Sequence, residues 1–247
     1  MIPYFSLTSF HLGPITIHVW GLMVAIGILA GTWASARLAK TRGQNVNVIW
    51  DLAPWLILGG FIGARIAHVF IYEPGFYFAH PMDMLRIWDG GWSSIGGLVG
   101  GVAAGVWYLK HKKLDLHAYA DTVIFGLPLG FAIGRLGCFF IHDHPGTLTH
   151  FVLGVQFPNG EVRHDLGLYE SINNAILFVI FVVLLRKRVR TGLFAIVFLI
   201  YYGASRFLLD FLRINDARYF HLTPAQYGAL AMVAAGIWFC LRPGLRL

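Results

Sequence analysis

Residues 118–141, AYADTVIFGLPLGFAIGRLGCFFI, form an apolar run that is long enough to cross a lipid bilayer as a helix, which takes about 20 residues. Its only charged residues are Asp121 and Arg135. Similar runs lie on both sides of it, near residues 15–37, 50–72, 92–109, 168–185, 191–212 and 225–241. We therefore predict an all-α integral membrane protein with about seven transmembrane helices, in a single domain over residues 1–247.

The composition agrees with this prediction. Of the 247 residues, 57% are hydrophobic and 13% are charged, and the mean hydropathy is +0.65. Soluble domains carry roughly 25% charged residues, so a water-soluble, disordered, collagen-like or coiled-coil chain is excluded. The chain has 29 glycines, which membrane helices use to pack closely. The first residues contain no basic cluster, so we do not expect a cleaved signal peptide.

The net charge of +7 is explained by the connections between the spans. Twelve of the 19 basic residues follow the first, third, fifth and last predicted spans. They are Arg37, Lys40, Arg42, Lys110, Lys112, Lys113, Arg186, Lys187, Arg188, Arg190, Arg242 and Arg246. Basic residues are enriched in cytoplasmic loops, so we predict an external N-terminus and a cytoplasmic C-terminus. No nucleic-acid partner is expected.

Three arginines, Arg65, Arg135 and Arg206, lie inside predicted spans, where a charge costs at least about 2.5–3.5 kcal/mol. Their spans run in the same direction, so all three fall in the outward half of the membrane. Other polar residues lie at the same depth: Glu170, Asn173, Asn174, Asp210 and Gln226. Guanidinium groups suit phosphate, so this cluster predicts a site for a phospholipid headgroup. The alternative is that the arginines are structural partners of the carboxylates.

Glycines open the third predicted span. Gly100 and Gly101 are expected at a helix–helix interface. Four others are expected where the backbone lies against a ligand: Gly90, Gly91, Gly96 and Gly97.

Two segments are expected outside the membrane core. Residues 73–91 are predicted to form an interfacial amphipathic segment. Residues 142–167 are predicted to form an extracytoplasmic cap loop, with β-like runs at 151–153 and 155–157. The cap contains four histidines, His142, His144, His150 and His164. Their spacing matches no common ligand pattern, so no metal site is expected.

Other membrane functions fit less well. A retinal photoreceptor needs a Schiff-base lysine in a span, and no predicted span has an interior lysine. A secondary transporter typically has repeated halves and a polar path across the midplane, whereas here the inner half is largely apolar. The residues favour an enzyme that acts on lipid in the outer leaflet.

Residues 134–146, GRLGCFFIHDHPG, resemble the signature G-R-x-G-N-F-x-N-x-E-x-x-G of bacterial prolipoprotein diacylglyceryl transferases. The resemblance continues over nearly the whole chain. It includes residues 14–21, 88–98, 164–170, 206–213 and 222–226.

This resemblance implies a reaction. The diacylglyceryl group of phosphatidylglycerol would move to the lipobox cysteine of a preprolipoprotein, with release of glycerol phosphate and without a cofactor. The enzyme would lie among membrane lipids in the bacterial cytoplasmic (inner) membrane as a multi-pass protein, with its active site facing the outer leaflet. Arg135 and Arg206 would hold the phosphate.

The expected site residues follow from the depth argument and the resemblance together. The expected catalytic residues are Arg135, Arg206, Asp143, His142 and His144. The expected substrate-binding residues are Trp20, Arg65, Gly96, Gly97, Gly137, Cys138, Gly146, His164, Tyr169, Glu170, Asp210 and Gln226.

The chain departs from the family pattern at three important positions. Ile95 stands where the family has a histidine, Cys138 where it has an asparagine, and Trp20 where it has a tyrosine. An ordinary thiol has a pKa of about 8.5 and needs a base near neutral pH, which Ile95 cannot supply. His142 and His144 are the candidate bases, and the identity of the acceptor stays open.

Overall fold

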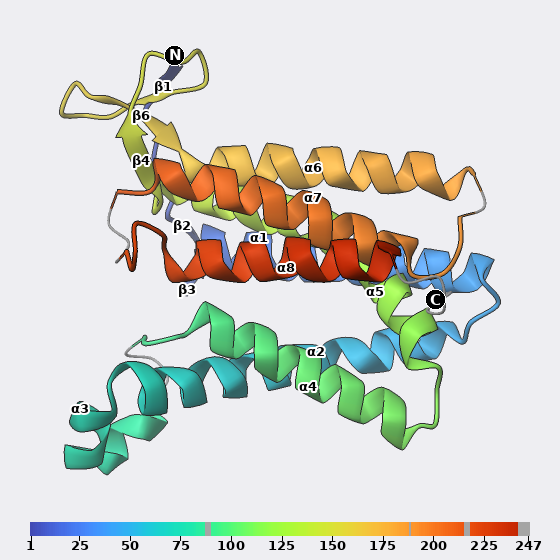
Figure 1. Ribbon diagram of the computed structural model, residues 1–247. Coiled ribbons are helices and arrows are strands. Elements are labelled where there is room, and N and C mark those ends of the chain that lie inside the picture. The colour runs from blue at the N-terminus through green and yellow to red at the C-terminus, as the bar shows by residue number, and fades with distance from the viewer. Residues whose placement is uncertain (87–89, 188, 215–217, 242–247) are drawn as a thin grey trace. The chain divides into compact units, whose positions relative to one another are not determined.

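A computed structural model (Figure 1) describes residues 1–86, 90–187, 189–214 and 218–241. The chain forms two compact units, one made of Met1–Leu38 with Ala120–Leu247 and the other of Ala39–Tyr119. Some positions of the sequence analysis lie outside the described residues: residues 87–89 of the segments 73–91 and 88–98, and the basic residues Arg188, Arg242 and Arg246.

Long helices dominate both units. They are α1 (Val19–Thr41), α2 (Val46–Ala67), α4 (Ser94–His111), α5 (Leu116–Ile141), α6 (Leu166–Leu185), α7 (Leu193–Leu209) and α8 (Pro224–Leu241). Six of these helices are long and apolar enough to span a membrane. For two of them the candidate span extends beyond the helix, from α2 to Tyr72 and from α7 to Leu212. The expectation of an all-α integral membrane protein is confirmed. The expected span 92–109 corresponds to α4, which is not among the six, because its 18 residues are rich in glycine and end on Lys110 and His111.

In the first unit, α6, α7 and α8 run side by side (Figure 1). The apolar core between the helices contains the fully buried rings of Phe181 and Phe194, with centroids 5.0 Å apart. Phe125 packs against both rings. Such aromatic contacts stabilise the packing beyond the burial of apolar surface alone. The contact between Phe181 and Phe194 joins the C-terminal end of α6 to the N-terminal end of α7.

Glycines bring α1 and α5 into backbone contact. A Cβ on Gly126 would lie 2.1 Å from the carbonyl oxygen of Gly31, and one on Gly27 would lie 2.5 Å from that of Gly130. No side chain fits at these distances, so this crossing requires glycine.

The second unit uses the same device between α2 and α4. A Cβ on Gly96 would lie 2.4 Å from the carbonyl oxygen of Gly63, and one on Gly100 would lie 2.2 Å from that of Gly59. The packing role predicted for Gly100 is confirmed. Gly96 and its neighbour Gly97 also face α2, so the close backbone approach expected there is made to a helix rather than to a ligand.

A small sheet covers one end of the first unit (Figure 1). It consists of β1 (Ile2–Pro3), β5 (Val155–Gln156), β6 (Val162–Asp165) and β4 (Pro145–Leu148), in that order. The strand expected at 155–157 is present, whereas the one expected at 151–153 was wrong. There the chain turns, and the N–H of Gly154 donates to the carbonyl oxygen of Phe151.

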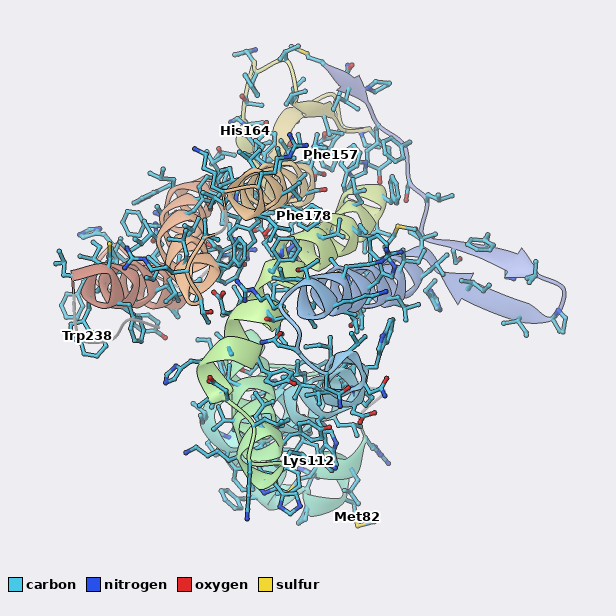
Figure 2. The ribbon with its side chains drawn as sticks, turned by 90° about the vertical axis from the view of Figure 1, so that its right-hand side faces the viewer. Met82, Lys112, Phe157, His164, Phe178 and Trp238 are labelled. Atoms are coloured by element: carbon cyan, nitrogen blue, oxygen red, sulfur yellow. The ribbon has the colours of Figure 1, made fainter. Side chains whose placement is uncertain are left out.

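The N-terminal segment joins this cap, which local patterns did not indicate. β1 pairs in parallel with β5. The following strands, β2 (Ser9–Leu12) and β3 (Ile15–His18), form an antiparallel hairpin, seen in Figure 2 as a pair of blue arrows extending away from α1.

The glycine crossing of α1 and α5 can be tested by substitution. Gly126→Val forces a side chain against the backbone of Gly31, and overpacking of this kind costs about 1–3 kcal/mol. We expect a lower midpoint of thermal unfolding in detergent, followed by tryptophan fluorescence. Gly21→Ala on α1 is the control, because its Cβ would meet nothing within 4 Å. Equal midpoints for both variants would contradict the assignment.

Candidate active site

Two arginines from different helices share one carboxylate at the sheet-covered end of the first unit. The Nε of Arg135, on α5, lies 2.7 Å from Oε2 of Glu170, on α6. The Nη1 of Arg206, on α7, donates to the other oxygen, Oε1. The expected convergence of these three residues is therefore present.

A second carboxylate extends the cluster. Oδ1 of Asp210 lies 3.2 Å from Nη2 of Arg206 and 3.2 Å from Nε of Arg213. The Nη2 of Arg213 is also 3.7 Å from Oε1 of Glu170. Arg213 is not among the expected site residues, although it ends the stretch 206–213 that resembles the family. Its i+7 spacing from Arg206 was the available indication, because such residues share one helix face.

Charge and burial distinguish the two kinds of group. The side chains of Glu170 and Asp210 are 5% and 0% exposed, whereas those of Arg135, Arg206 and Arg213 are 28%, 16% and 18% exposed. Pairing offsets the cost of burying these carboxylates. Three cations against two anions leave one excess positive charge, on the more exposed side of the cluster. The structural role and the anion-binding role are therefore compatible.

Gln226 supports the cluster from the start of α8. Thr223 and Gln226 form a capping box, in which each backbone N–H donates to the other residue's side chain. The Gln226 amide also donates to the carbonyl oxygen of Phe207, and the Thr223 hydroxyl donates to Asp210. Gln226 is fully buried and both ends of its amide are in use, so the structure gives it a positioning role in place of the expected substrate contact.

His142 connects the end of α5 to the start of α6. Its Nδ1 lies 2.6 Å from Oδ2 of Asp165, and both side chains are 1% exposed. Asp165 also accepts the N–H of Leu168 as the N-cap of α6. Aromatic rings surround the imidazole: Tyr4, Phe5, Phe139 and Phe157. This burial makes His142 a structural residue, so the structure does not favour it as a base.

His144 is placed differently from His142. Its ring and the Asp143 carboxylate are each about one-third exposed, with Nδ1 3.7 Å from Oδ1. The Sγ atom of Cys138, a carboxylate oxygen of Asp143 and a ring nitrogen of His144 lie within 4.8 Å of one another, and all three are atoms that can bind a metal ion. The guanidinium of Arg135 donates to Sγ of Cys138 at 3.9 Å. His144 is therefore the cap histidine that lies next to the arginine cluster.

Two glycines of the expected site let the backbone pack closely. A Cβ on Gly137 would lie 3.2 Å from Cα of Trp20, which places α1 against the motif. One on Gly146 would lie 2.9 Å from the carbonyl oxygen of Leu212, beside the bridge that joins Gly146 to Arg213.

His164 and Tyr169 form a pair in the cap, and Figure 2 labels His164 there together with Phe157. The Nδ1 of His164 lies 2.7 Å from the Tyr169 hydroxyl. Burial lowers the pKa of His164, which favours the neutral ring, and a neutral ring can accept a hydrogen bond from the Tyr169 hydroxyl at Nδ1.

Arg65 belongs to the second unit and has a different environment. All five of its N–H groups are used by backbone carbonyl oxygens. The acceptors are those of Asp83, Met84, Arg86, Gly90 and Gly91. Arg65 therefore organises the segment after α2, and its expected phosphate contact would require these bonds to break.

Six of the described helices are long and apolar enough to cross a membrane, and a partly exposed cationic cluster lies at one end of the first unit, so the fold is that of a multi-pass membrane protein. The chain belongs to the prolipoprotein diacylglyceryl transferase family, whose model matches residues 8–242. The expectation of a transferase is thereby confirmed.

Similar proteins support the same assignment. A protein of Symbiobacterium thermophilum is 31% identical, over 98% of this chain and 96% of its own length. One of Geobacter sulfurreducens is 33% identical over 87% and 85%, and one of Staphylococcus saprophyticus is 33% identical over 87% and 81%. Each is named phosphatidylglycerol–prolipoprotein diacylglyceryl transferase.

The contribution of Glu170 to the stability of the fold can be measured. Glu170→Gln removes a buried carboxylate from between partly buried guanidiniums, and breaking a buried pair costs about 3–5 kcal/mol. We expect a strongly lowered unfolding midpoint in detergent. Glu161→Gln is the matched control, because it removes the carboxylate of the more exposed pair with Arg163, and solvent-exposed pairs contribute little to stability. A similar loss in both variants would contradict the role of Glu170.

Proposed function

We propose that this protein transfers the diacylglyceryl group of phosphatidylglycerol to the lipobox cysteine of preprolipoproteins and releases glycerol phosphate. The observation that carries the proposal is the cluster of Arg135, Arg206 and Arg213 over two buried carboxylates. Its excess positive charge suits a single phosphodiester. The names of the similar proteins support the same two substrates.

The reaction is a substitution at carbon. The acceptor sulfur, as a thiolate, forms a bond to the terminal glyceryl carbon, and the bond from that carbon to the phosphate oxygen breaks. The bonding electrons leave with glycerol phosphate, so negative charge grows on the leaving group. Guanidinium N–H groups that already hold the phosphate stabilise this charge. The carboxylates of Glu170 and Asp210 keep these guanidiniums in place before the substrate arrives.

The thiol proton needs an acceptor. His144 is the best placed imidazole of the cap, because it is partly exposed and lies beside Asp143 and Cys138. Its Nδ1 is 2.8 Å from the carbonyl oxygen of Asp143, which leaves Nε2 as the nitrogen for proton transfer.

The proposal includes a location. The arginine cluster lies at the N-terminal ends of α6 and α8 and the C-terminal ends of α5 and α7. The connecting segments rich in lysine and arginine, which are typical of the cytoplasmic side, adjoin the opposite ends of these helices. We therefore place the site at the outer leaflet of the bacterial cytoplasmic membrane.

A second candidate function keeps phosphatidylglycerol as the donor and changes the acceptor. Ile95 and Cys138, which replace a histidine and an asparagine of the family pattern, favour it. Comparison of lipids and lipoproteins from cells with and without the gene separates the two. Loss of lipoprotein modification supports the first function, and an altered lipid profile with intact lipoproteins supports the second. A non-catalytic lipid-binding or transport protein predicts neither change.

The guanidinium cluster can be tested without removing its charge. Arg135→Lys keeps a cation beside Glu170 but loses the planar fork that binds phosphate. We expect peptide modification to fall by about 100-fold or more, as for the loss of one transition-state donor. The assay uses purified protein, phosphatidylglycerol and a lipobox peptide, with release of glycerol phosphate as a second readout.

Arg37→Lys is the control for this experiment, because Arg37 lies near the far end of α1 over the ring of Trp33. It should retain full activity. Complementation of a strain lacking the transferase repeats the comparison in cells. An Arg135→Lys enzyme as active as the Arg37→Lys enzyme would overturn the proposed role of the cluster.

A further inference from the structure

Cys138, Asp143 and His144 form a group of three different ligand types beside the arginine cluster. One sulfur, one carboxylate oxygen and one imidazole nitrogen lie within 4.8 Å of one another. Cys138 is 5% exposed, whereas the other two side chains are about one-third exposed. The group therefore has a buried side and an accessible side.

The local fold at the end of α5 brings these three residues together. Cys138 lies in the last turn of the helix, and His142, with φ +50°, ends it and reverses the chain. The His142–Asp165 pair holds this reversal, so the next two residues fold back over Cys138. Gly167 leaves room for this arrangement, because a Cβ there would lie 3.0 Å from Cβ of Cys138.

The donor set is one that Zn²⁺ prefers. Zinc binds cysteine sulfur, histidine nitrogen and aspartate oxygen at about 2.0–2.3 Å, so tetrahedral ligand atoms lie about 3.3–3.8 Å apart. A shift of about 1 Å by Asp143 and His144, which are partly exposed and follow the end of α5, brings the three ligand atoms to this spacing. A thiolate and a carboxylate neutralise the two charges of the ion, so the nearby Arg135 is not repelled.

We propose that Cys138, Asp143 and His144 bind Zn²⁺ and leave a fourth position open for the thiol of the acceptor peptide. Three protein ligands with an open position are typical of catalytic zinc, whereas structural sites use four. This proposal deepens the proposed function and rests on it for the identity of the acceptor.

The open position would solve the problem posed by Ile95. A thiol that coordinates zinc is deprotonated outright, so neither the family's histidine nor His144 is needed as a base, and His144 acts in the zinc-bound protein as a ligand instead. The proton leaves to solvent through the exposed side of the group. The thiolate then forms its bond to the glyceryl carbon, glycerol phosphate departs with the electron pair, and the ion keeps its charge throughout.

Metal content tests the site independently of activity. The full-length protein, purified in detergent, is loaded with Zn²⁺, desalted and analysed by mass spectrometry of the metal. We expect one Zn²⁺ per chain in the wild type and at least a tenfold loss in Cys138→Asn, which restores the family's side chain. Cys240→Ala and His150→Ala, outside the group, should keep the metal. Equal metal content in Cys138→Asn and wild type would overturn the site.

Cobalt tests the open position. Co²⁺-loaded protein should show a thiolate charge-transfer absorption that is absent in Cys138→Asn, and that absorption should increase when a lipobox peptide is added. The same peptide with serine in place of cysteine is the control. An unchanged spectrum with the cysteine peptide would overturn the role in thiol activation. Failure of the proposed function is distinguishable, because it would leave metal binding intact and abolish peptide modification in every variant.

Discussion

The arrangement of the site depends on the ion pairs that the Glu170 carboxylate forms with two arginines. It is buried on α6 and paired with arginines from α5 and α7, so three helices must end at the same level for the charges to meet. Removing one partner of such a pair leaves an uncompensated charge, at a cost of about 3–5 kcal/mol. The cluster therefore selects one register of these helices, and the same register places guanidinium edges where a phosphate can reach them.

Close helix packing makes this meeting of charges possible. Gly126 and Gly31 allow α1 to cross α5 with backbones in contact. The Ser171 hydroxyl donates to the carbonyl oxygen of Ala132 and joins α6 to α5, while Asn173 donates to Ser205 and joins α6 to α7. Each bond satisfies a polar group that lipid could not satisfy. The apolar composition thus forces the polar groups into a few inter-helix contacts, and the arginine cluster is one of them.

Depth in the membrane predicted that Arg135, Glu170, Arg206 and Asp210 belong to one site. Hydropathy gives the position of each span, and the alternating direction of the spans shows which end of each one faces outward. Depth cannot distinguish a ligand contact from a structural one, so it grouped Arg65 with them, although Arg65 holds backbone carbonyls in the other unit. The sheet was harder to predict. β1 pairs with a strand more than 150 residues away, and no local pattern encodes such a pairing. The Thr223–Gln226 capping box is a local pattern that the sequence contains, whereas Gln226 was predicted only as a substrate-binding residue.

Arg135 connects the two halves of the chemistry. Its Nε pairs with Glu170 in the cluster that would hold the donor phosphate, and its Nη1 donates to Cys138 in the group that would hold the acceptor thiol. One guanidinium thus lies between the two groups, so the leaving group and the nucleophile would be held close together. The two departures from the family pattern then become chemically related. With zinc bound at the proposed site, a chain that lacks a base at Ile95 and carries a thiol at Cys138 would exchange proton abstraction by histidine for thiolate formation at the ion.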